Sequence, residues 1–495
     1  MNNRFVCVIS LITGFILTLM SLVTVEALED NRISVNSNYE SYTNNQFEMR
    51  QKTISIPQEG RFYVRKISFM NNDGIYFTEF MVPGEEGTLT YVDEAGKLIE
   101  MPLKEGVQPE GRALFLETES YAYLLGQGYV YKDLGKGTIE SVHQTPISIK
   151  QVDGGWMVQY RYKMIKDAFG ILWGVGSEHQ LVNFESETER KVWEKRDFDY
   201  FARIGYEGYY YQSPSTYSPT SDNSYWLIPS AYMAHHNIRK GQGRLDTILG
   251  NALLHLSMEQ LGDNQYLPTL PESSWLKQDY DISAGFFDTR FNADMMLTFL
   301  EGYRKYGIPA YRQSYLRLAD YYMKHGSSRH FEVSRDENDV RVLNNKMPFR
   351  TIELSEASAG FPEDTKGWLV WDYADKNTER VTHVSLNHHA FAAHVFFQLF
   401  LEEQDARYLE FAEYKLNGII LTTDIWIKDN NNLEYALLPS GNMGFIDYDY
   451  LTYNDLFLLQ NSVKEVYGAR GKSLDVLMEN KMKWMLNNSV HDFME

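Results

Sequence analysis

The chain is poor in cysteine and in positive charge. Its 495 residues include a single cysteine, Cys7, and the formal net charge is −20 at pH 7. One cysteine cannot form an intramolecular disulfide or a multi-cysteine metal site. Cys7 also lies in a segment that we expect to be removed, so the mature protein is expected to have no thiol nucleophile. The negative charge argues against nucleic acid as a partner, because nucleic-acid binding needs a basic surface.

Long apolar runs are confined to the N-terminus. Arg4 precedes an apolar run from residue 5 to about residue 25, which ends at the small-residue site Val25-Glu26-Ala27. This pattern is typical of a secretory signal peptide over residues 1–27. An uncleaved membrane anchor is the alternative, because about 20 apolar residues also span a bilayer. We therefore expect a secreted or surface-attached protein. Residues 28–50 are polar and rich in Asn and Ser, which predicts a linker.

Aromatic residues are abundant, with 35 tyrosines and 9 tryptophans. They could fill the interfaces between helices. Alternatively, some could form flat platforms on which sugar rings stack, since ligand pockets combine aromatic walls with a few polar anchors.

Residues 51–190 show a period of two. Residues 156–164 alternate large apolar side chains with polar ones, which predicts a half-buried strand. Thr88–Val92 and Lys97–Met101 flank the turn sequence Asp93–Gly96, which predicts a hairpin. We expect an antiparallel β domain here, as a sandwich or a set of sheets. It contains no chemical motif of its own.

Four stretches in residues 191–495 resemble one helical hairpin repeated. Three contain an aromatic-or-Leu/Asn pair, at Phe291-Asn292, Leu386-Asn387 and Tyr453-Asn454, and a fourth runs from Tyr225 to Gly262 without the Asn. Hairpins that each leave an apolar face uncovered stack on one another. We therefore predict an (α/α) toroid of about four hairpins. The Asn-bearing helices should lie inside, with their leading loops gathered at one mouth.

Two long loops, Leu267–Asp288 and Phe331–His383, interrupt this array. Loops of such length inside a compact array tend to be functional. The loops and helix starts would bring carboxylates, tyrosines, histidines, a tryptophan and an arginine to the mouth: Glu272, Trp275, Asp288, Arg290, His383, His388, Asp447, Tyr448, Asp449, Tyr450 and Tyr453.

This set of side chains suits two kinds of carbohydrate chemistry. A glycoside hydrolase needs two carboxyl groups that flank a glycosidic bond, for which the candidates are Glu272, Asp288, Asp447 and Asp449. A uronate epimerase or a lyase abstracts the C5 proton, and needs a base, an acid and a cation that stabilises the developing charge. A non-catalytic glycan-binding or export-accessory protein is the third alternative.

The sequence contains no strong metal or cofactor motif. His388-His389 and His235-His236 are adjacent pairs, and neighbouring residues point to different helix faces. His389 and His394 are also wrongly spaced for one face. Neither a P-loop, a Gly-x-Ser-x-Gly elbow nor a dinucleotide fingerprint is present. We expect neither a metal nor a cofactor.

Two segments, His383–Phe391 and Tyr448–Leu456, resemble the C-terminal region of the D-glucuronyl C5-epimerases. The order of leader, β region and α/α region is similar as well. In that family an Asp-Tyr pair followed by Thr, His and Asn leads into the last inner helix, and its tyrosine exchanges the C5 proton. Asp449-Tyr450 with Thr452 and Asn454 match this pattern.

The resemblance implies C5-epimerisation of uronic acid residues in a polysaccharide, which is our first choice. Tyr450 and Tyr453 would donate or accept protons, with His383, His388 or Glu379 on the opposite face. The family's arginine-bearing loop is replaced here by Leu438–Asn442. The remaining substrate contacts would come from Arg290, Arg380, Asn387, Asn454, Trp275 and Tyr448. A homodimer is left open.

Overall fold

The computed structural model describes residues 33–494 except 73, 94–96, 108–112, 196–202, 213–223, 242, 263, 355–358, 378 and 492. The expected signal peptide or anchor, residues 1–27, therefore lies outside the described residues. Of the helices that are described, none is long and apolar enough to cross a membrane.

The chain forms two compact units. Unit 1 comprises Met1–Ser273 and Glu301–Gln313, and unit 2 comprises Ser274–Leu300 and Ser314–Glu495. The division falls later in the chain than residue 190, where the sequence changes from β to helical patterning. Two helices, α6 (Thr289–Tyr306) and α7 (Pro309–Ser328), contribute to both units.

Unit 1 is mainly β structure. Its strands are β1 (Asn36–Thr43), β2 (Phe47–Ile56), β3 (Gly60–Phe69), β4 (Ile75–Pro83), β5 (Gly87–Val92), β6 (Leu98–Pro102), β7 (Ala113–Thr118), β8 (Ala122–Gly126), β9 (Gly128–Gly135), β10 (Thr138–Thr145), β11 (Ile147–Val152), β12 (Gly155–Lys163), β13 (Ala168–Ser177), β14 (Tyr209–Gln212) and β15 (Ser224–Pro229). Its helices are α1 (Glu187–Lys195), α3 (Ser230–His235), a π-helical turn (His236–Lys240) and α4 (Arg244–Leu261).

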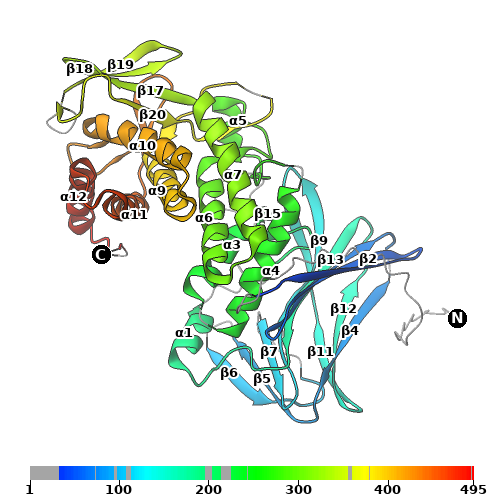
Figure 1. Ribbon diagram of the computed structural model, residues 1–495. Helices are drawn as coiled ribbons and strands as arrows, with labels where there is room; N and C mark the ends of the chain where they lie inside the picture. Colours follow the sequence, from blue (N-terminus) through cyan, green and yellow to red (C-terminus); the bar gives the residue numbers. More distant parts are fainter. Residues whose placement is uncertain are drawn as a thin grey trace. The chain divides into compact units, whose positions relative to one another are not determined.

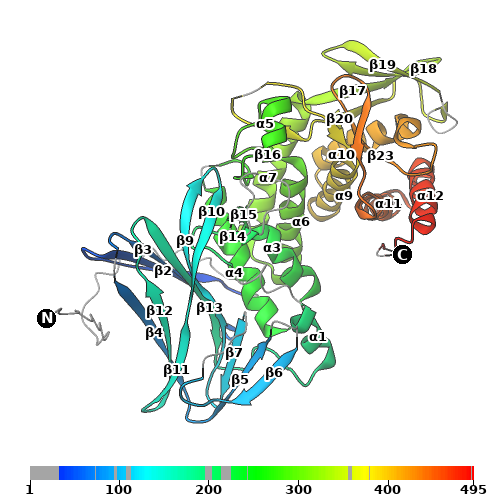
Figure 2. The same ribbon diagram turned by 180° about the vertical axis from the view of Figure 1, so that it is seen from behind.

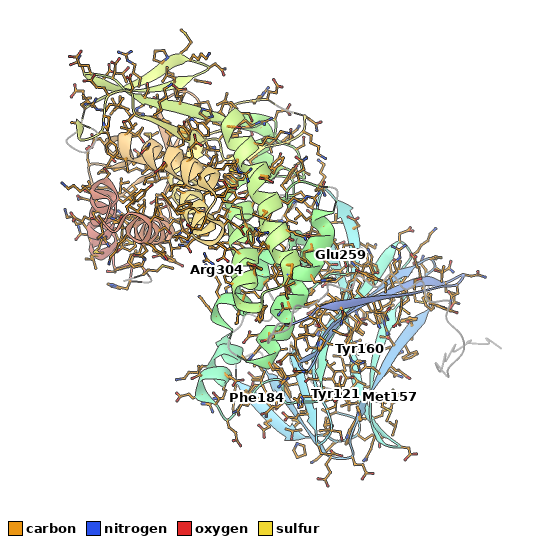
Figure 3. All side chains as sticks on the ribbon, viewed as in Figure 1. Tyr121, Met157, Tyr160, Phe184, Glu259 and Arg304 are labelled. Carbon is orange, nitrogen blue, oxygen red and sulfur yellow. The ribbon has the colours of Figure 1, made fainter. Side chains whose placement is uncertain are left out.

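Twelve of these strands form one antiparallel sheet, and β11, β12 and β4 form a second (Figure 1). The larger sheet runs β14-β15-β10-β9-β13-β8-β7-β5-β6, and the ribbon β1-β2-β3 joins it through β13. Inward side chains of both sheets share one core, which includes Leu89, Leu116, Val158 and Tyr160. Figure 3 shows side chains filling this region around Tyr160. The predicted antiparallel β region is confirmed, as are its strand at residues 156–164 and its hairpin at β5 and β6.

The expected linker over residues 28–50 is wrong for the described part of that segment. β1 pairs with β2 over its whole length, from Asn36 opposite Ser55 to Thr43 opposite Glu48. Backbone hydrogen bonds to β2 hold the strand even though it buries little apolar surface. Polar composition alone therefore did not reveal it.

The predicted fourth hairpin begins differently from the pattern at Tyr225. Residues 224–229 form β15, and Tyr225 pairs with Ile139 of β10. Aromatic residues favour strands, and Pro229 restricts the residue before it to an extended conformation. Helical structure begins only at Ser230, with α3, the π-helical turn and α4.

Unit 2 contains three helical hairpins. Its helices are α5 (Ser274–Tyr280), α6 and α7, α9 (Leu386–Glu403), α10 (Ala406–Leu421), a 3-10 turn (Thr423–Trp426), α11 (Leu451–Tyr467) and α12 (Lys472–Asn487). Its strands are β16 (Phe287–Asp288), β17 (His330–Arg335), β18 (Asp339–Asn344), β19 (Met347–Glu353), β20 (Lys366–Val370), β21 (Tyr373–Ala374), β22 (Val384–Ser385), β23 (Glu434–Leu437) and β24 (Met443–Ile446). Figure 2 shows α9, α10, α11 and α12 side by side.

The predicted fold class, an antiparallel β region followed by helical hairpins of the (α/α) toroid kind, is confirmed. The segment Phe331–His383 is not a plain loop, however. It contains the four-stranded sheet β19-β18-β17-β20, whose strand β20 packs against α10. Alternation in residues 330–353 is the signal that a loop prediction overlooked.

The structure places the three repeated asparagines at similar but not identical positions in their helices. Asn292 and Asn387 are buried, and Asn454 is half-buried. Asn292 and Asn454 are each the fourth residue of their helix, whereas Asn387 is the second residue of α9. The middle hairpin is therefore shifted by two positions relative to the sequence alignment.

The contact between α10 and β20 depends on glycine. A Cβ atom added at Gly418 would lie 2.3 Å from the carbonyl oxygen of Trp368 in β20. We expect Gly418→Ala to lower the free energy of unfolding by about 1–3 kcal/mol, because backbone must move. Urea unfolding measures this change.

Gly302→Ala in α6 is the matched control. Its added Cβ would meet Leu254 Cδ1 at 2.8 Å, the end of a flexible side chain. Alanine also gains about 0.8–1 kcal/mol of helix propensity in both variants. Equal stability changes in the two variants would contradict the backbone contact as the cause.

Candidate functional site

Short strands and helix starts of unit 2 bring a buried polar cluster together. Asp372 lies just before β21, His383 just before β22, Ser385 at the end of β22 and His388 in the first turn of α9. We call these four residues the Asp372 cluster. Backbone hydrogen bonds fix the segments: the amide of Asp372 donates to the carbonyl of His383, and the amide of Thr289 donates to the carbonyl of Asp372, both at 3.0 Å.

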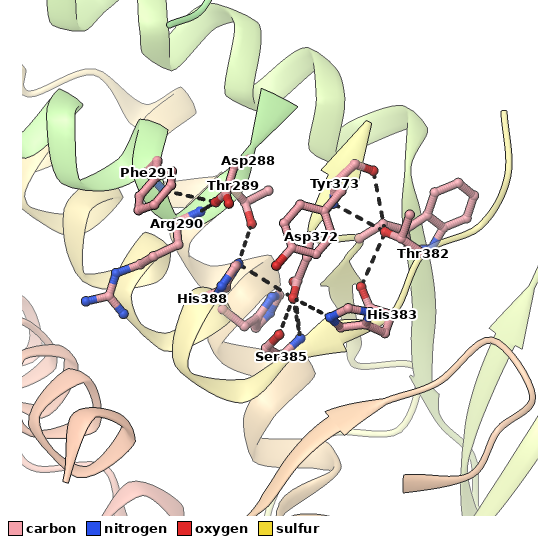
Figure 4. Close-up of polar contacts among 12 residues, drawn as sticks. Asp288, Thr289, Arg290, Phe291, Asp372, Tyr373, Thr382, His383, Ser385 and His388 are labelled. Atoms are coloured by element: carbon pink, nitrogen blue, oxygen red, sulfur yellow. Dashed lines mark hydrogen bonds and ion pairs between the residues drawn. The ribbon is translucent and has the colours of Figure 1, made fainter. Parts of the chain in front are cut away.

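Asp372 is the centre of this cluster (Figure 4). Its carboxylate accepts the Ser385 amide at 3.0 and 3.1 Å and also the Ser385 hydroxyl. His383 Nε2 lies 3.4 Å and His388 Nδ1 lies 3.5 Å from Asp372 Oδ2. His388 Nδ1 is also 3.0 Å from the hydroxyl of Thr289. The arrangement links one carboxyl group to two imidazoles.

Burial controls the protonation of these groups. It raises the pKa of Asp372 well above its usual value, and the nearby Asp288 raises it further, whereas hydrogen bonds from Ser385 lower it. Burial also lowers the pKa of His383 to about 3 and the pKa of His388 well below its usual value. Both imidazoles are therefore neutral at pH 7.

His383 continues the cluster to a tyrosine. Its Nδ1 atom lies 3.0 Å from the hydroxyl of Tyr280, the last residue of α5. When Nε2 carries the proton and faces Asp372, Nδ1 accepts a hydrogen bond from Tyr280. Burial raises the pKa of Tyr280 to about 12, so it stays protonated. Tyr280, His383 and Asp372 thus lie in one row: Tyr280 is hydrogen-bonded to His383, and His383 Nε2 lies 3.4 Å from Asp372 without a hydrogen bond to the described residues.

Aromatic rings cover His383. Trp275 stacks on its imidazole with centroids 5.7 Å apart, and Phe445 meets it edge-on at 5.2 Å. The ring centroid of Tyr435 lies 6.3 Å from that of His383 and 5.7 Å from that of Tyr448. We call Trp275, Tyr435, Phe445 and Tyr448 the aromatic patch. Phe445 and Tyr448 are 45% and 50% exposed, so part of the patch faces solvent.

Phe445 is held in an unfavourable backbone conformation. Its φ of 67° lies in the left-handed region, which a bulky residue rarely adopts. Such conformations cost about 1–3 kcal/mol and cluster at ligand sites. Here the strained backbone belongs to β24, and the ring lies over both His383 and Trp275.

Arg290 is occupied by internal ion pairs. Its Nε atom donates to Asp294 at 2.9 Å, and its two terminal nitrogens donate to Asp455, one of them at 3.1 Å. The guanidinium also lies 4.2 Å from the ring centroid of Phe391. Figure 4 shows it directed away from Asp372. The structure therefore gives Arg290 a role in joining helices, while its predicted role in substrate binding stays a prediction.

Asp288 caps helix α6. Its Oδ1 atom accepts the amides of Arg290 at 2.8 Å and Phe291 at 3.0 Å, which satisfies the first turn of the helix. Burial raises the pKa of Asp288 to about 7, although these two amides lower it. At neutral pH Asp288 is therefore partly protonated.

Asp447 forms a buried ion pair. Its carboxylate accepts the Lys481 ammonium at 2.6 Å and the Thr452 hydroxyl at 2.5 Å. Lys481 also donates to the Asn432 side chain and to the carbonyl of Tyr448, both at 2.7 Å. All three hydrogens of the ammonium are thus used, and Asp447 anchors the loop that leads into α11.

The remaining predicted residues on this loop differ in exposure. Tyr450 precedes α11 and is 42% exposed, and Asp449 beside it is exposed too. Tyr453 is buried and packs edge-on against Phe493. Asn454 is half-buried and accepts a backbone hydrogen bond from residue 494. Tyr450 is therefore the more accessible of the two candidate proton carriers.

Three predicted residues lie outside the cluster. Glu272 belongs to unit 1, where it pairs with Lys136 at 2.7 Å. Glu379 and Arg380 are exposed in the segment between β21 and β22. By contrast, Asn387 is buried at the start of α9, and its Oδ1 atom has no hydrogen-bond partner among the described residues.

Sequence reasoning overlooked Asp372, Ser385, Lys415 and Asp455. Asp372 lay in a segment taken as a long loop, although its flanking aromatics Trp371 and Tyr373 predict a strand. Asp455 directly follows Asn454 in the last hairpin. Lys415 is a cation buried on the apolar side of helix α10, which is an unusual position. Within the described part of the chain, no three His, Cys, Asp or Glu side chains are arranged to hold a metal ion.

Lys415 is buried beside His389. The Nε2 atom of His389 donates to the carbonyl of Lys415 at 3.1 Å, so its Nδ1 accepts from the Lys415 side chain at 3.0 Å. Burial lowers the pKa of Lys415 to about 7, although Asp372 raises it. A neutral amine suffices for this hydrogen bond.

The depressed pKa of Lys415 predicts a pH-dependent stability. Between its folded pKa of about 7 and its usual value of 10.5, the unfolded chain binds one more proton than the folded chain. The free energy of unfolding should therefore rise with pH across this window, by up to about 1.4 kcal/mol per pH unit. Lys415→Met should remove this contribution, as urea unfolding at several pH values measures. Exposed Lys324→Met is the matched control, and parallel profiles for parent and Lys415→Met would contradict the prediction.

No known protein family and no curated protein sequence matches the chain. Solved structures show distant similarity. The Lin0763 protein from Listeria innocua is 9% identical, with a TM-score of 0.32, and the match covers 54% of this chain and 59% of that one. The α-1,6-mannanase GH76A of Salegentibacter sp. HEL1_6, in complex with α-1,6-mannotriose, is 12% identical, with a TM-score of 0.34 and 57% and 66% covered.

A D-mannose isomerase is 13% identical to the chain, with a TM-score of 0.34, and the match covers 53% of this chain and 64% of that one. The chain thus spans less than two thirds of these proteins. At such TM-scores, the similarities identify neither an activity nor a ligand.

Proposed function

We propose that the protein acts on a polysaccharide by proton transfer at C5 of a uronic acid residue. The observation that carries this proposal is the row Tyr280–His383–Asp372 beneath a partly exposed aromatic patch. Such a patch offers apolar faces to a sugar ring, and the row beneath it can move a proton. Epimerisation returns the proton to the opposite face of C5.

His383 is the base in this proposal, and it acts through Tyr280, because its Nδ1 atom accepts from the Tyr280 hydroxyl and its Nε2 atom faces Asp372. It is neutral in the free protein, so its imidazole can accept a proton. A bound uronate brings a negative charge, which raises the pKa of a nearby imidazole toward the range that suits general-base catalysis. The Asp372 carboxyl group, 3.4 Å from Nε2, would orient the imidazole. The base would then become effective only with an acidic substrate present.

A tyrosine would return the proton. Tyr450 corresponds to the proton-exchanging tyrosine of the resembled epimerases, and its exposure leaves it accessible to a polymer. Tyr453 is packed against Phe493 and suits a structural role better. Tyr448, in the aromatic patch, is the other accessible hydroxyl on this loop.

The carboxylate of the substrate needs a positive partner. Arg290 is already paired with Asp294 and Asp455, so it offers little to a ligand. The N-terminus of α9 is buried and already faces the Asp372 carboxyl group, which accepts the Ser385 amide. Arg380, exposed between β21 and β22, is therefore the candidate partner.

A glycoside hydrolase is the second candidate, and one observation favours it. The pKa of Asp288 is raised by burial to about 7, and a partly protonated carboxyl group suits a general acid. Other buried carboxyl groups, however, are engaged: Asp447 with Lys481, and Asp455 with Arg290.

The proposed activity on a polysaccharide also implies that the protein is exported from the cytoplasm. N-terminal sequencing of the exported protein tests whether the signal peptide is cleaved after Ala27.

Solvent isotope exchange distinguishes these chemistries. In deuterated water, an epimerase should place deuterium at C5 of the polymer without shortening the chain. Mass spectrometry and size-exclusion chromatography measure the two quantities. Chain shortening without exchange would favour the hydrolase, and an unsaturated product that absorbs in the ultraviolet would favour a lyase. Binding with no reaction would leave only a glycan-binding protein.

Tyr450→Phe should abolish exchange and leave folding intact. The substitution removes a hydroxyl and keeps an exposed ring, so little packing is lost. Loss of general acid–base assistance costs roughly 10²–10⁴ in rate. Tyr453→Phe is the matched control and should retain most activity. Near-normal turnover of Tyr450→Phe with an unchanged melting temperature would remove Tyr450 from the mechanism.

A further inference from the structure

Unit 1 has a groove of its own, with a volume of about 380 Å³. It lies on one face of β1, β2, β3 and β13, and Phe80 of β4 and Tyr123 of β8 form its wall. The polar side chains along its floor include Asn38, Gln51, Thr53, Arg61 and Arg65. All of these residues belong to unit 1.

Strand register explains why this face is polar. Asn38 lies opposite Thr53, Thr53 opposite Tyr63, and Tyr63 opposite Gly174. Because side chains alternate along a strand, residues two positions away share the same face. A second row therefore runs parallel to the first, through residues Glu40, Gln51, Arg65 and Leu172. A third row runs through Ser55, Arg61 and Gly176.

Glycines on β13 shape the groove. A Cβ atom at Gly174 would lie 2.4 Å from the Tyr63 hydroxyl oxygen, and one at Gly176 would lie 2.7 Å from the Tyr123 ring. The rings therefore lie directly over the backbone of β13. Phe80 approaches Tyr63 at 6.1 Å and Tyr123 at 5.6 Å between centroids, which gives the groove an apolar side.

The groove carries two arginines without a paired carboxylate. Arg65 donates to the neutral side chains of Gln51, at 2.6 and 2.9 Å, and Thr78. Arg61 is exposed and lies 5.9 Å from the ring centroid of Tyr121. No described carboxylate lies within 4.0 Å of either guanidinium. Glu40 is the one acid that lines this groove, so the arginines outnumber it. Such a site is unexpected in a chain whose net charge is −20.

A second pocket extends the groove. It has a volume of about 340 Å³ and shares Ser55 and Arg61 with the first. Its other lining residues include Tyr121, Ser177 and two acids, Glu59 and Glu178. Glu59 is paired with Arg244 at 2.7 Å, so the positive part of the site is the first pocket, around Arg61 and Arg65. Arg61 thus stands where the two pockets meet. Two adjoining pockets of this size can hold neighbouring residues of a linear polymer, because each falls in the range of small-ligand sites.

We propose that this groove binds an acidic sugar residue of the polysaccharide. The guanidinium of Arg61 binds the sugar carboxylate, since its planar fork matches carboxylate geometry. Arg65, held by Gln51 and Thr78, adds a second positive charge. The polar rows bind the hydroxyls, and Phe80 and Tyr123 contact the apolar ring face. The inference rests on the proposed function for an acidic polysaccharide, and it adds a separate binding site for that polymer in unit 1.

The test is an NMR titration of the mature protein with D-glucuronate and, as the neutral match, D-glucose. Glucuronate should bind the parent at least about tenfold more tightly than glucose, because a bond to a charged group contributes about 1.5–3 kcal/mol. Arg61→Gln should weaken glucuronate binding by a similar factor. Arg50→Gln is the control: Arg50 neighbours Gln51 on β2, points to the other face and pairs with Glu48 at 2.7 Å.

Three outcomes would overturn the proposal. They are equal binding of glucose and glucuronate, unchanged binding by Arg61→Gln, and displacement of glucuronate by an equal concentration of inorganic sulfate, which would indicate a general anion site. Melting temperatures show whether Arg61→Gln is folded. Arg61→Lys, which keeps the charge, tests the fork separately and should bind glucuronate more weakly than the parent. Phe445→Ala in unit 2 should lower turnover but keep Arg61-dependent binding, so the groove and the proposed activity can fail independently.

Discussion

The helical part of unit 2 depends on one guanidinium, Arg290, whose side chain is 15% exposed and whose partner Asp455 is buried. Arg290 of α6 pairs with Asp455 of α11 and lies over the ring of Phe391 in α9. It also pairs with Asp294 one turn along its own helix. The starts of three inner helices thus meet at a single side chain. Breaking a buried pair by removing one partner typically costs about 3–5 kcal/mol, because the other charge stays buried and unpaired.

The pairing of Arg290 also determines which groups are left to interact with Asp372. With Arg290 occupied by Asp294 and Asp455, Asp372 has no arginine partner among the described residues and relies on Ser385 and two neutral imidazoles. Burial therefore dominates its protonation and raises its pKa. Groups with perturbed pKa values in one place are typical of functional sites, although structural networks produce them as well. The strained Phe445 above the cluster is an independent sign, since it comes from backbone geometry.

The sequence predicted the classes of element well because they follow from short-range periodicity. The strand at residues 156–164 and the three helical hairpins depend on neighbouring side chains, and the structure has them all. The composition of the site was harder to predict. Trp275, His383 and His388 lie around Asp372 in unit 2, with Asp288 near enough to raise the pKa of Asp372, but Glu272 is held by Lys136 in unit 1. No local pattern shows which carboxylate a lysine far along the chain will meet.

Arg290 is a second residue whose partners the local sequence pattern could not reveal. From the sequence, an arginine at a helix start near an aromatic-lined mouth suits substrate binding and structural pairing equally well. What decides between them is Asp455, which lies 165 residues away and belongs to another hairpin. Asp372 was overlooked for a related reason, because its partners Ser385 and His388 become neighbours only when β21, β22 and α9 assemble.

The strand β1 shows why a polar composition can wrongly predict a lack of regular structure. A segment rich in Asn and Ser resembles a linker when burial of apolar surface is the criterion. A strand that lines a polar groove must look the same, because the side chains on one of its faces point to ligand or water and not to a core. Asn38 and Glu40 meet this description, since each lines the groove and lies opposite a polar partner on β2. Polarity in a strand that is hydrogen-bonded along its whole length is therefore better explained by what its face contacts than by a lack of structure.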